Sequence, residues 1–250
     1  MLAVLGGAVH GQHRARATRE AALRDASRDP QTWVIAFLYI GTFGSFIGFS
    51  FAFGQVLADQ FASHFLTAGM VDPVKVAYLT FLGPLLGSLS RPLGGRLADR
   101  AGGARTTFSV FVLMALAASA VLAASLQKSL ILFYVGFIAL FVLSGIGNGS
   151  TYKMIPAIFR SKSRLRAAAG ADPDTVEHES RRMANAVIGM AGAVGAAGGV
   201  LVNIAFRQSF LASGTGTAAY IGFIAFYVIC VCLTLLCYLR IGARRGLPNV

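Results

Sequence analysis

The sequence predicts an all-α integral membrane protein with six transmembrane helices. Three observations support this class: the composition, the length of the apolar runs and the placement of the basic residues. Of the 250 residues, 56% are hydrophobic and 13% are charged, and the mean hydropathy is +0.67. A soluble domain carries about a quarter charged residues. A chain with so few charges cannot cover a water-facing surface of ordinary size, which excludes an ordinary soluble enzyme.

Six apolar segments are long enough to cross a bilayer, since a helix needs about 20 apolar residues to span a hydrocarbon core of about 30 Å. These segments are residues 32–53, 74–98, 106–126, 130–159, 183–206 and 218–239. They lack the ten-residue alternation of β-barrel strands. We therefore expect residues 31–240 to form a six-helix bundle. The fourth segment is too long for a perpendicular span, so we expect it to tilt, to bend near Gly145, Gly147 and Gly149, or to leave the membrane before Pro156.

The two ends of the chain differ from this bundle. Residues 1–9 are apolar but too short to span, and they lack the basic leader of a signal peptide. This run fits the remnant of a preceding transmembrane helix. Residues 11–30 are polar and charged. We interpret residues 1–30 as a cytoplasmic linker, which can hold a short amphipathic helix, and residues 241–250 as a cytoplasmic tail.

Lys and Arg concentrate on one side of the predicted membrane. That side holds five bases in the linker, three between the second and third spans, six between the fourth and fifth, and three in the tail. The opposite side holds three. Because positive residues mark the cytoplasmic side, we expect a multi-pass protein of the inner or plasma membrane with both termini in the cytoplasm. The net charge of +12 reflects this topology, so we expect no nucleic-acid partner.

The sequence shows none of the residue patterns of an enzyme. It has no carboxylate pair, no nucleophile with an adjacent base and no cluster with metal-ligand spacing. The three cysteines, Cys230, Cys232 and Cys237, all fall in the last apolar stretch and are interpreted as small hydrophobic residues. We expect no enzymatic activity, no cofactor and no metal.

Arg91 is a permanent charge inside the second predicted span, where a charge is costly. The one acid on these helices is Asp99, at the cytoplasmic end of the same helix and eight residues after Arg91, which puts it about 12 Å along the helix and about 80° around it. Intimate pairing of the two is not expected. Because arginine stays charged at physiological pH, its counter-ion can be a bound anion. An arginine that reaches the headgroups, or one satisfied by carbonyls and water, fits equally well.

Tyr39 and Phe43 are four residues apart and so share one face of the first span. An aromatic plate with a hydroxyl beside it suits a flat anion held by a guanidinium, although aromatic residues in membrane helices commonly serve packing or lipid contact. In the fifth span, Gly189, Gly192 and Gly195 form a stripe of small residues. Such a stripe lets another helix, or a substrate, approach the backbone closely.

Lys153 is the second base within a predicted span. It follows Leu130 by 23 residues, or about 34 Å of straight helix, which puts it near the cytoplasmic surface. We expect its side chain to snorkel to the interface. The alternative is a cation that faces a cavity, where it attracts anions or titrates during coupling.

The loop between the second and third spans resembles the loop motif of the major facilitator superfamily. The matching positions are Gly95, Asp99, Arg100, Gly102 and Arg105. Glycines permit a tight turn, and the acid and bases can exchange partners as helix ends move. In a complete member the motif lies between helices two and three and again between eight and nine. Six helices with this loop and cytoplasmic termini therefore resemble the C-terminal half, helices seven to twelve.

Three further stretches, residues 41–50, 83–91 and 147–156, are similar to the nitrate/nitrite porter family. In that family each half contributes an arginine to a central anion site with aromatic residues around the planar substrate. The resemblance implies that Arg91, Phe43 and Tyr39 bind substrate. It also likens the glycine stripe to the family's nitrate signature in helix eleven. The family's arginine in helix two and its first nitrate signature have no counterpart here.

The resemblance implies transport of nitrate and/or nitrite by a protein of which this chain supplies one half. Transport of this kind needs two bundles that rock around the site, so we expect a matching N-terminal six-helix half as partner, together with the lipid bilayer. Two alternatives stay open at this point. The chain can be a truncated or non-transporting membrane subunit, or part of a carrier for another small anion.

Overall fold

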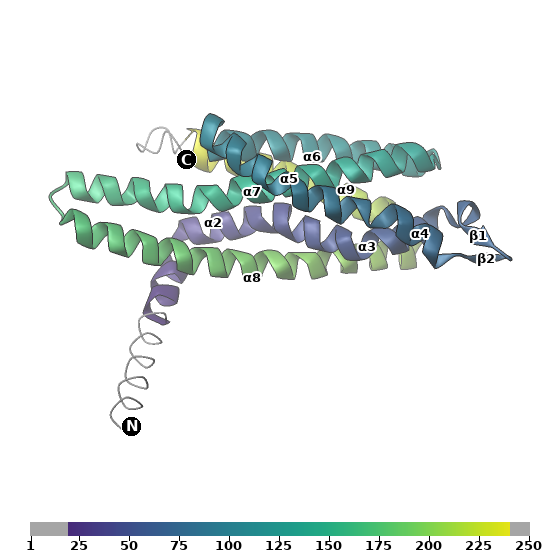
Figure 1. Cartoon of the computed structure of the whole chain (residues 1–250), viewed down its shortest axis with the longest axis horizontal. Coiled ribbons are helices and arrows are strands. Elements are labelled where there is room, and N and C mark those ends of the chain that lie inside the picture. The colour runs from purple at the N-terminus through teal and green to yellow at the C-terminus, as the bar shows by residue number, and fades with distance from the viewer. Residues whose placement is uncertain (1–19, 241–250) are drawn as a thin grey trace, which may run out of the picture.

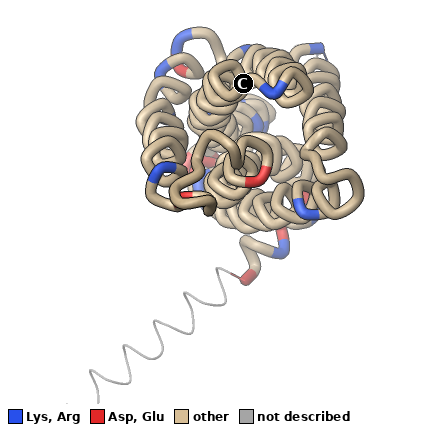
Figure 2. The backbone as a smooth tube through the Cα atoms, turned by 90° about the vertical axis from the view of Figure 1, so that its right-hand side faces the viewer, with Lys and Arg blue, Asp and Glu red and all other residues tan. Residues whose placement is uncertain are grey.

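The computed structural model describes residues 20–240, so the expectations for residues 1–19 and for the tail 241–250 lie outside the described residues. Residues 20–28 are helical. The chain then forms α2 (Pro30–Tyr39), η1 (Ile40–Gly44), α3 (Ser45–Gln60), η2 (Ala62–His64), β1 (Leu66–Thr67), β2 (Met70–Val71), α4 (Pro73–Thr80), α5 (Leu82–Ala101), α6 (Gly103–Leu126), α7 (Leu130–Ala168), α8 (Pro173–Ser213), α9 (Thr217–Thr234) and η3 (Leu235–Arg240). The long helices lie side by side along one axis (Figure 1). Seen along that axis, few charges lie on them (Figure 2).

Five helical stretches among residues 20–240 are long and apolar enough to cross a membrane. They are Pro30–Gln60, Gly103–Leu126, Leu130–Ala168, Pro173–Ser213 and Thr217–Arg240. The predicted second span, residues 74–98, is helical but is interrupted at Phe81 and is not among the five. Its second part, α5, carries three arginines and Asp99, which lower its hydropathy. Residues 20–240 are therefore mostly helical, as predicted for a membrane protein, with five candidate spans and a more polar sixth segment.

Three helices begin with the same local signal, an aspartate followed by proline. The aspartate side chain accepts a hydrogen bond from a backbone N–H of the first turn, and the proline at the first helical position needs no such partner. The pairs are Asp29 with Gln31 (2.9 Å), Asp72 with Val74 (2.9 Å) and Asp172 with Thr175 (3.0 Å). The Val74 N–H holds the pKa of Asp72 below its usual range. These caps start α2, α4 and α8.

Helices α7 and α8 extend well beyond the bilayer thickness. With 39 and 41 residues they are about 58 and 62 Å long. Helix α7 continues through Pro156 to Ala168, so the helix is longer than the apolar run of the fourth segment. The bases assigned to a long fourth–fifth loop therefore lie on helices, joined through residues 169–172. Hydropathy indicates how much of a helix lies in lipid, but it does not determine where the helix ends. The ends depend on caps and on contacts such as the Arg166–Glu179 ion pair (2.9 Å).

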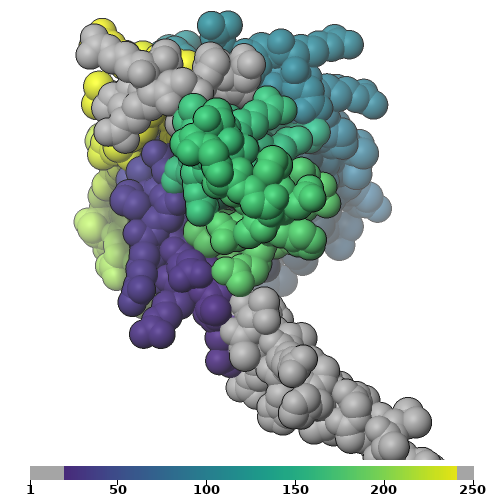
Figure 3. Space-filling model, turned by 90° about the vertical axis from the view of Figure 1, so that its left-hand side faces the viewer, coloured from purple at the N-terminus to yellow at the C-terminus, as the bar shows by residue number. Residues whose placement is uncertain are grey.

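The start of the described chain packs against this helical hairpin, as Figure 3 shows for the N-terminal segment beside the α7–α8 end. Asp29 contacts Lys162 of α7 at 2.6 Å, and Asp25 contacts Arg182 of α8 at 3.3 Å. Ala22 and Ala26 are buried one turn apart. Residues 20–29 are thereby held against α7 and α8 by one small apolar face and two ion pairs.

The opposite end of the bundle carries a feature that an all-helical prediction does not include. Strands β1 and β2 pair antiparallel between α3 and α4. The turn between them has Ala68 at φ 53° and Gly69 at φ 84°, the backbone of a tight hairpin turn. The aromatic core lies between this end and the bundle centre, where the rings of Phe53 and Phe137 stack with centroids 4.5 Å apart. This aromatic packing joins α3 to α7.

Candidate functional site

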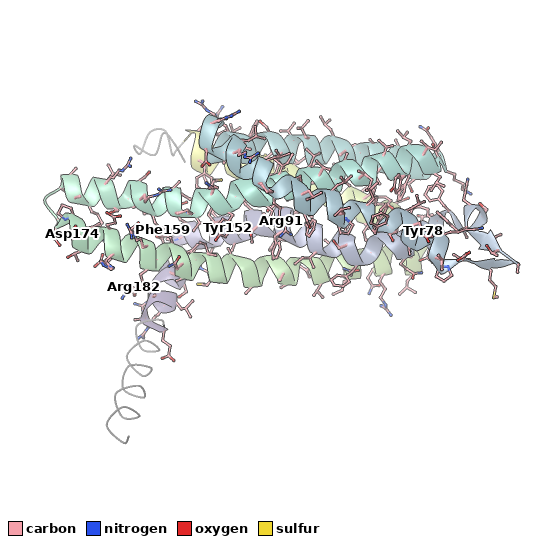
Figure 4. All side chains as sticks on the ribbon, in the orientation of Figure 1. Tyr78, Arg91, Tyr152, Phe159, Asp174 and Arg182 are labelled. Atoms are coloured by element: carbon pink, nitrogen blue, oxygen red, sulfur yellow. The ribbon has the colours of Figure 1, made fainter. Side chains whose placement is uncertain are left out.

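A cleft of about 530 Å³ opens part-way along the bundle between three segments. Its lining comes from the α2–η1 junction, from α5 and from α7: Tyr39, Phe43, Arg91, Pro92, Gly95, Arg96, Asp99, Asn148, Gly149, Tyr152 and Lys153. Figure 4 places Arg91 and Tyr152 near the middle of the long axis, with Asp174 towards one end. The cleft therefore lies far from the tip of the α7–α8 hairpin.

Glycines bring α5 and α7 into backbone contact beside the cleft. A Cβ atom at Gly94 would lie 1.9 Å from the carbonyl oxygen of Ile146, and one at Gly149 would lie 2.1 Å from the carbonyl oxygen of Arg91. Real Cβ atoms do not approach so closely, so each position requires glycine in this packing. The contact sets the relative height of the two helices and holds Arg91 level with Gly149.

Arg91 lies over aromatic faces. Its guanidinium carbon is 4.4 Å from the ring centroid of Phe46 and 5.7 Å from that of Phe43, within the range of cation–π attraction. Its Nε is buried and, among the described residues, Arg91 has no hydrogen-bond partner and no ion pair. The aromatic rings hold the cation in place and leave its N–H donors free.

The π-helical turn η1 contains Phe43, and Tyr39 lies directly before it. The rings of Tyr39 and Phe43 are 5.2 Å apart and tilted by 32°. A Cβ atom at Gly195 would lie 2.9 Å from the Tyr39 ring and 3.2 Å from the Phe43 ring. Gly195 therefore contacts the two rings and lets α8 pack against them. Single π-helical turns within α-helices are frequent at functional sites.

Gly189 and Gly192 do not line the cleft. A Cβ atom at either position would meet nothing within 4 Å among the described residues. Gly189 and Gly195 do not share one face of α8, because six residues of α-helix leave them about 120° apart around the axis. Gly195 packs inside this chain, whereas Gly189 and Gly192 face open space.

Lys153 is in the cleft and forms an ion pair with Asp99 at 2.9 Å. The two side chains are 47% and 59% exposed, so the pair contributes little to stability. Asp99 thus contacts Lys153 rather than Arg91. The sequence analysis did not predict this pair, because the partners are 54 residues apart and meet only when α5 packs on α7.

The remaining residues of the loop motif lie around the end of α5. Gly102 has φ 92° and joins α5 directly to α6, a backbone that favours glycine. Arg100 and Arg105 are exposed beside this turn, and Gly95 lines the cleft next to Lys153. The tight turn predicted from the glycines is present.

Six lining or contacting residues were missed from the sequence: Phe46, Pro92, Arg96, Asn148, Gly149 and Tyr152. A helical-face argument finds one of them. Phe46 is three residues after Phe43 and seven after Tyr39, so all three share a face. Asn148 and Tyr152 are four apart on α7, but nothing in the sequence says which face of α7 meets α5.

The charge of the cleft suits an anion. Its lining holds the cations Arg91, Arg96 and Lys153 against one carboxylate, Asp99. Since Asp99 is paired with Lys153, the two arginines supply the excess positive charge. Within residues 20–240, no group of three His, Cys, Asp or Glu side chains lies close enough to hold a metal ion.

Membrane-length helices around a positively charged cleft define a multi-pass membrane protein with a candidate anion site between its helices. Comparison with known families gives the assignment. Residues 3–171 match the family model described as the Major Facilitator Superfamily. The match covers more than half of the sequence, and the chain belongs to this superfamily.

Individual relatives show which members of the superfamily this chain is similar to. The chain is 36% identical over 214 residues to the nitrate/nitrite transporter NarU of Escherichia coli (strain K12), a match that covers 83% of this chain and 44% of the relative. It is 34% identical over 224 residues to the probable nitrate/nitrite antiporter NarK2 of Thermus thermophilus, covering 88% and 45%. These matches confirm the resemblance to nitrate/nitrite porters. The chain spans about half the length of the curated relatives it matches.

Proposed function

We propose that this chain acts as the C-terminal half of a transporter for nitrate and/or nitrite. The observation that carries the proposal is Arg91, a cation in a membrane cleft with free N–H donors and two aromatic faces around it. A guanidinium presents a planar fork that matches two oxygens of a flat oxyanion. Phe43 stacks on the plane of the anion, and Tyr39 offers a hydroxyl at its edge. The relatives named above as nitrate/nitrite transporters support this substrate class.

The partner in this proposal is a matching N-terminal six-helix half. Transporters of this kind place the substrate between two bundles that rock around it. Gly189 and Gly192 face open space and can accept a closely packed helix from that half. In this role they border the substrate path, with Gly195 supporting the aromatic rings. We further propose that α4 and α5 together form the sixth crossing, whose charged residues face the cleft and the partner half.

The same proposal gives a role to the charged end of α5. Asp99 and Lys153 line the cleft as a pair exposed to solvent. Asp99, with Arg100 and Arg105 at the Gly102 turn, can exchange partners as the two halves rock. Lys153 is then the candidate coupling residue, released when Asp99 changes its partner.

The proposed orientation puts the α7–α8 hairpin in the cytoplasm of the cell, below the plasma or inner membrane. The ends of the described chain, the α5–α6 turn and the α7–α8 connection all lie at one end of the bundle (Figure 1). In a variant without Cys230, Cys232 and Cys237, single cysteines replacing Ser63 and Ser213 should react with an impermeant thiol reagent from outside intact cells. A cysteine replacing Ser163 should react only after permeabilisation. The reverse pattern would contradict the orientation.

Uptake by a two-half assembly tests the function. The assembly is this chain co-expressed with a matching N-terminal half, reconstituted into liposomes. We expect saturable uptake of nitrate or nitrite by the assembly and none by the six-helix chain, because the substrate site lies between two halves. Saturable uptake by the purified chain would mean that two copies build both halves. Assembly without uptake would favour a non-transporting subunit, and uptake of another anion in preference would favour the other-anion carrier.

A further inference from the structure

Asn148 is a buried polar residue of the cleft to which nothing above assigns a role. It lies on α7, is 5% exposed and lines the cleft together with Arg91. Its side chain makes no hydrogen bond with any residue in the range 20–240. The amide is not fully enclosed, so its donors and its acceptor are open to the cleft, where a ligand can pair with them. A residue of this kind indicates a site for a hydrogen-bonding ligand.

Two other polar groups, the half-buried Asn203 and the buried Thr151, show what a purely structural role looks like in this protein. The amide of Asn203 donates to the carbonyl oxygens of Gly199 at 2.8 Å and Gly48 at 3.3 Å. The hydroxyl of Thr151, one turn from Asn148, donates to the carbonyl oxygen of Gly147 at 2.8 Å. Asn148 makes no such bond and faces the cleft instead.

The packing of α5 on α7 keeps Asn148 at the height of Arg91. The neighbouring residue, Gly149, approaches the Arg91 carbonyl so closely that a Cβ would lie 2.1 Å from that oxygen. A helix pair in backbone contact cannot slide without breaking this fit. The amide of Asn148 and the guanidinium of Arg91 therefore line the same level of one cleft, from adjacent helices.

We propose that Asn148 is a second binding residue for the anion, whose amide NH₂ group donates to an oxygen that the Arg91 fork leaves free. This rests on the function proposed above. An amide adds donors without adding charge, so it strengthens the hold on a monovalent oxyanion without creating a site for a more highly charged one. In this site Arg91 supplies the positive charge, and the amide donors of Asn148 fix the orientation of the anion.

The test compares Asn148→Leu and Asn148→Asp with Asn203→Leu in the two-half assembly. Asn148→Leu keeps the size and removes the donors, and Asn148→Asp keeps the shape but turns the donor into a carboxylate beside Arg91. One hydrogen bond to a charged group corresponds to a loss of about tenfold or more in affinity. We expect both Asn148 variants to raise the KM for nitrate by at least that factor, with unchanged kcat in the leucine variant. Asn203→Leu should leave the KM unchanged and lower thermal stability.

A binding measurement separates this proposal from the proposed function. The rise in melting temperature on adding nitrate is measured for the parent assembly, for Arg91→Gln and for Asn148→Leu. A rise in the parent that both variants lose supports the proposal. A rise that Arg91→Gln loses and Asn148→Leu keeps overturns the role of Asn148 and leaves the function standing. A parent without any response to nitrate overturns both.

Discussion

Arg91→Gln should abolish most nitrate binding by the two-half assembly. Arg91 brings a permanent charge and free N–H donors into the cleft, and the described part of the chain offers it no other anion. Losing one charge-assisted hydrogen bond costs about 1.5–3 kcal/mol, which is roughly a 10- to 150-fold loss of affinity. A bidentate contact doubles the number of bonds at risk. Nitrate affinity is measured by isothermal titration, with size exclusion as the check of folding.

Arg91→Lys is the matched variant, because it keeps the charge and removes the planar fork. An ammonium is a point charge with a different donor geometry. The lysine would contact the Phe46 ring through this compact group instead of a planar guanidinium. We expect affinity between that of the parent and that of Arg91→Gln. Normal binding by Arg91→Gln would mean that Arg91 is a structural cation held by Phe43 and Phe46. Normal binding by Arg91→Lys alone would mean that charge suffices.

Much of the fold could be predicted from the sequence, because the bilayer imposes a length and a polarity on each span. All six predicted segments are helical, apart from the interruption at Phe81. The helix ends could not be predicted in the same way. α7 and α8 continue outside the apolar runs, where the Asp172 cap and the contact between Arg166 and Glu179 stabilise them. The cap is a local Asp-Pro signal that hydropathy alone does not register, and the ion pair joins residues on two helices.

Some residues of the candidate site could be predicted from the sequence, whereas others depend on how the helices pack. Arg91 stands out in the sequence as a charge inside an apolar segment, Tyr39 and Phe43 were selected by their shared face and by the family resemblance, and the structure places all three in one cleft. Asn148 and the Asp99–Lys153 pair depend on the height at which α5 packs on α7. Gly94 and Gly149 fix that height through their close backbone contacts. The sequence alone does not show which residue a glycine will contact.

Gly94→Ala should separate α5 from α7 and destabilise the folded chain. The added Cβ would lie 1.9 Å from the carbonyl oxygen of Ile146, which is backbone and cannot turn away. Overpacking of this kind costs about 1–3 kcal/mol and is only partly offset by about 1 kcal/mol from the better helix propensity of alanine. We expect a lower melting temperature of the purified chain in detergent. Nitrate affinity of the two-half assembly should also fall, because the shift moves Arg91 relative to Asn148.

Gly192→Ala is the control, since a Cβ there meets no described atom within 4 Å. It should leave the melting temperature of the purified chain unchanged or slightly raised, because alanine stabilises an open helix position. The larger variant Gly192→Leu should still fold but should weaken assembly with the N-terminal half, if that half packs against the open face of α8. Equal melting temperatures for Gly94→Ala and Gly192→Ala would contradict the backbone contact between α5 and α7. A lower melting temperature for Gly94→Ala with unchanged nitrate affinity would show that the height of the two helices does not govern the anion site.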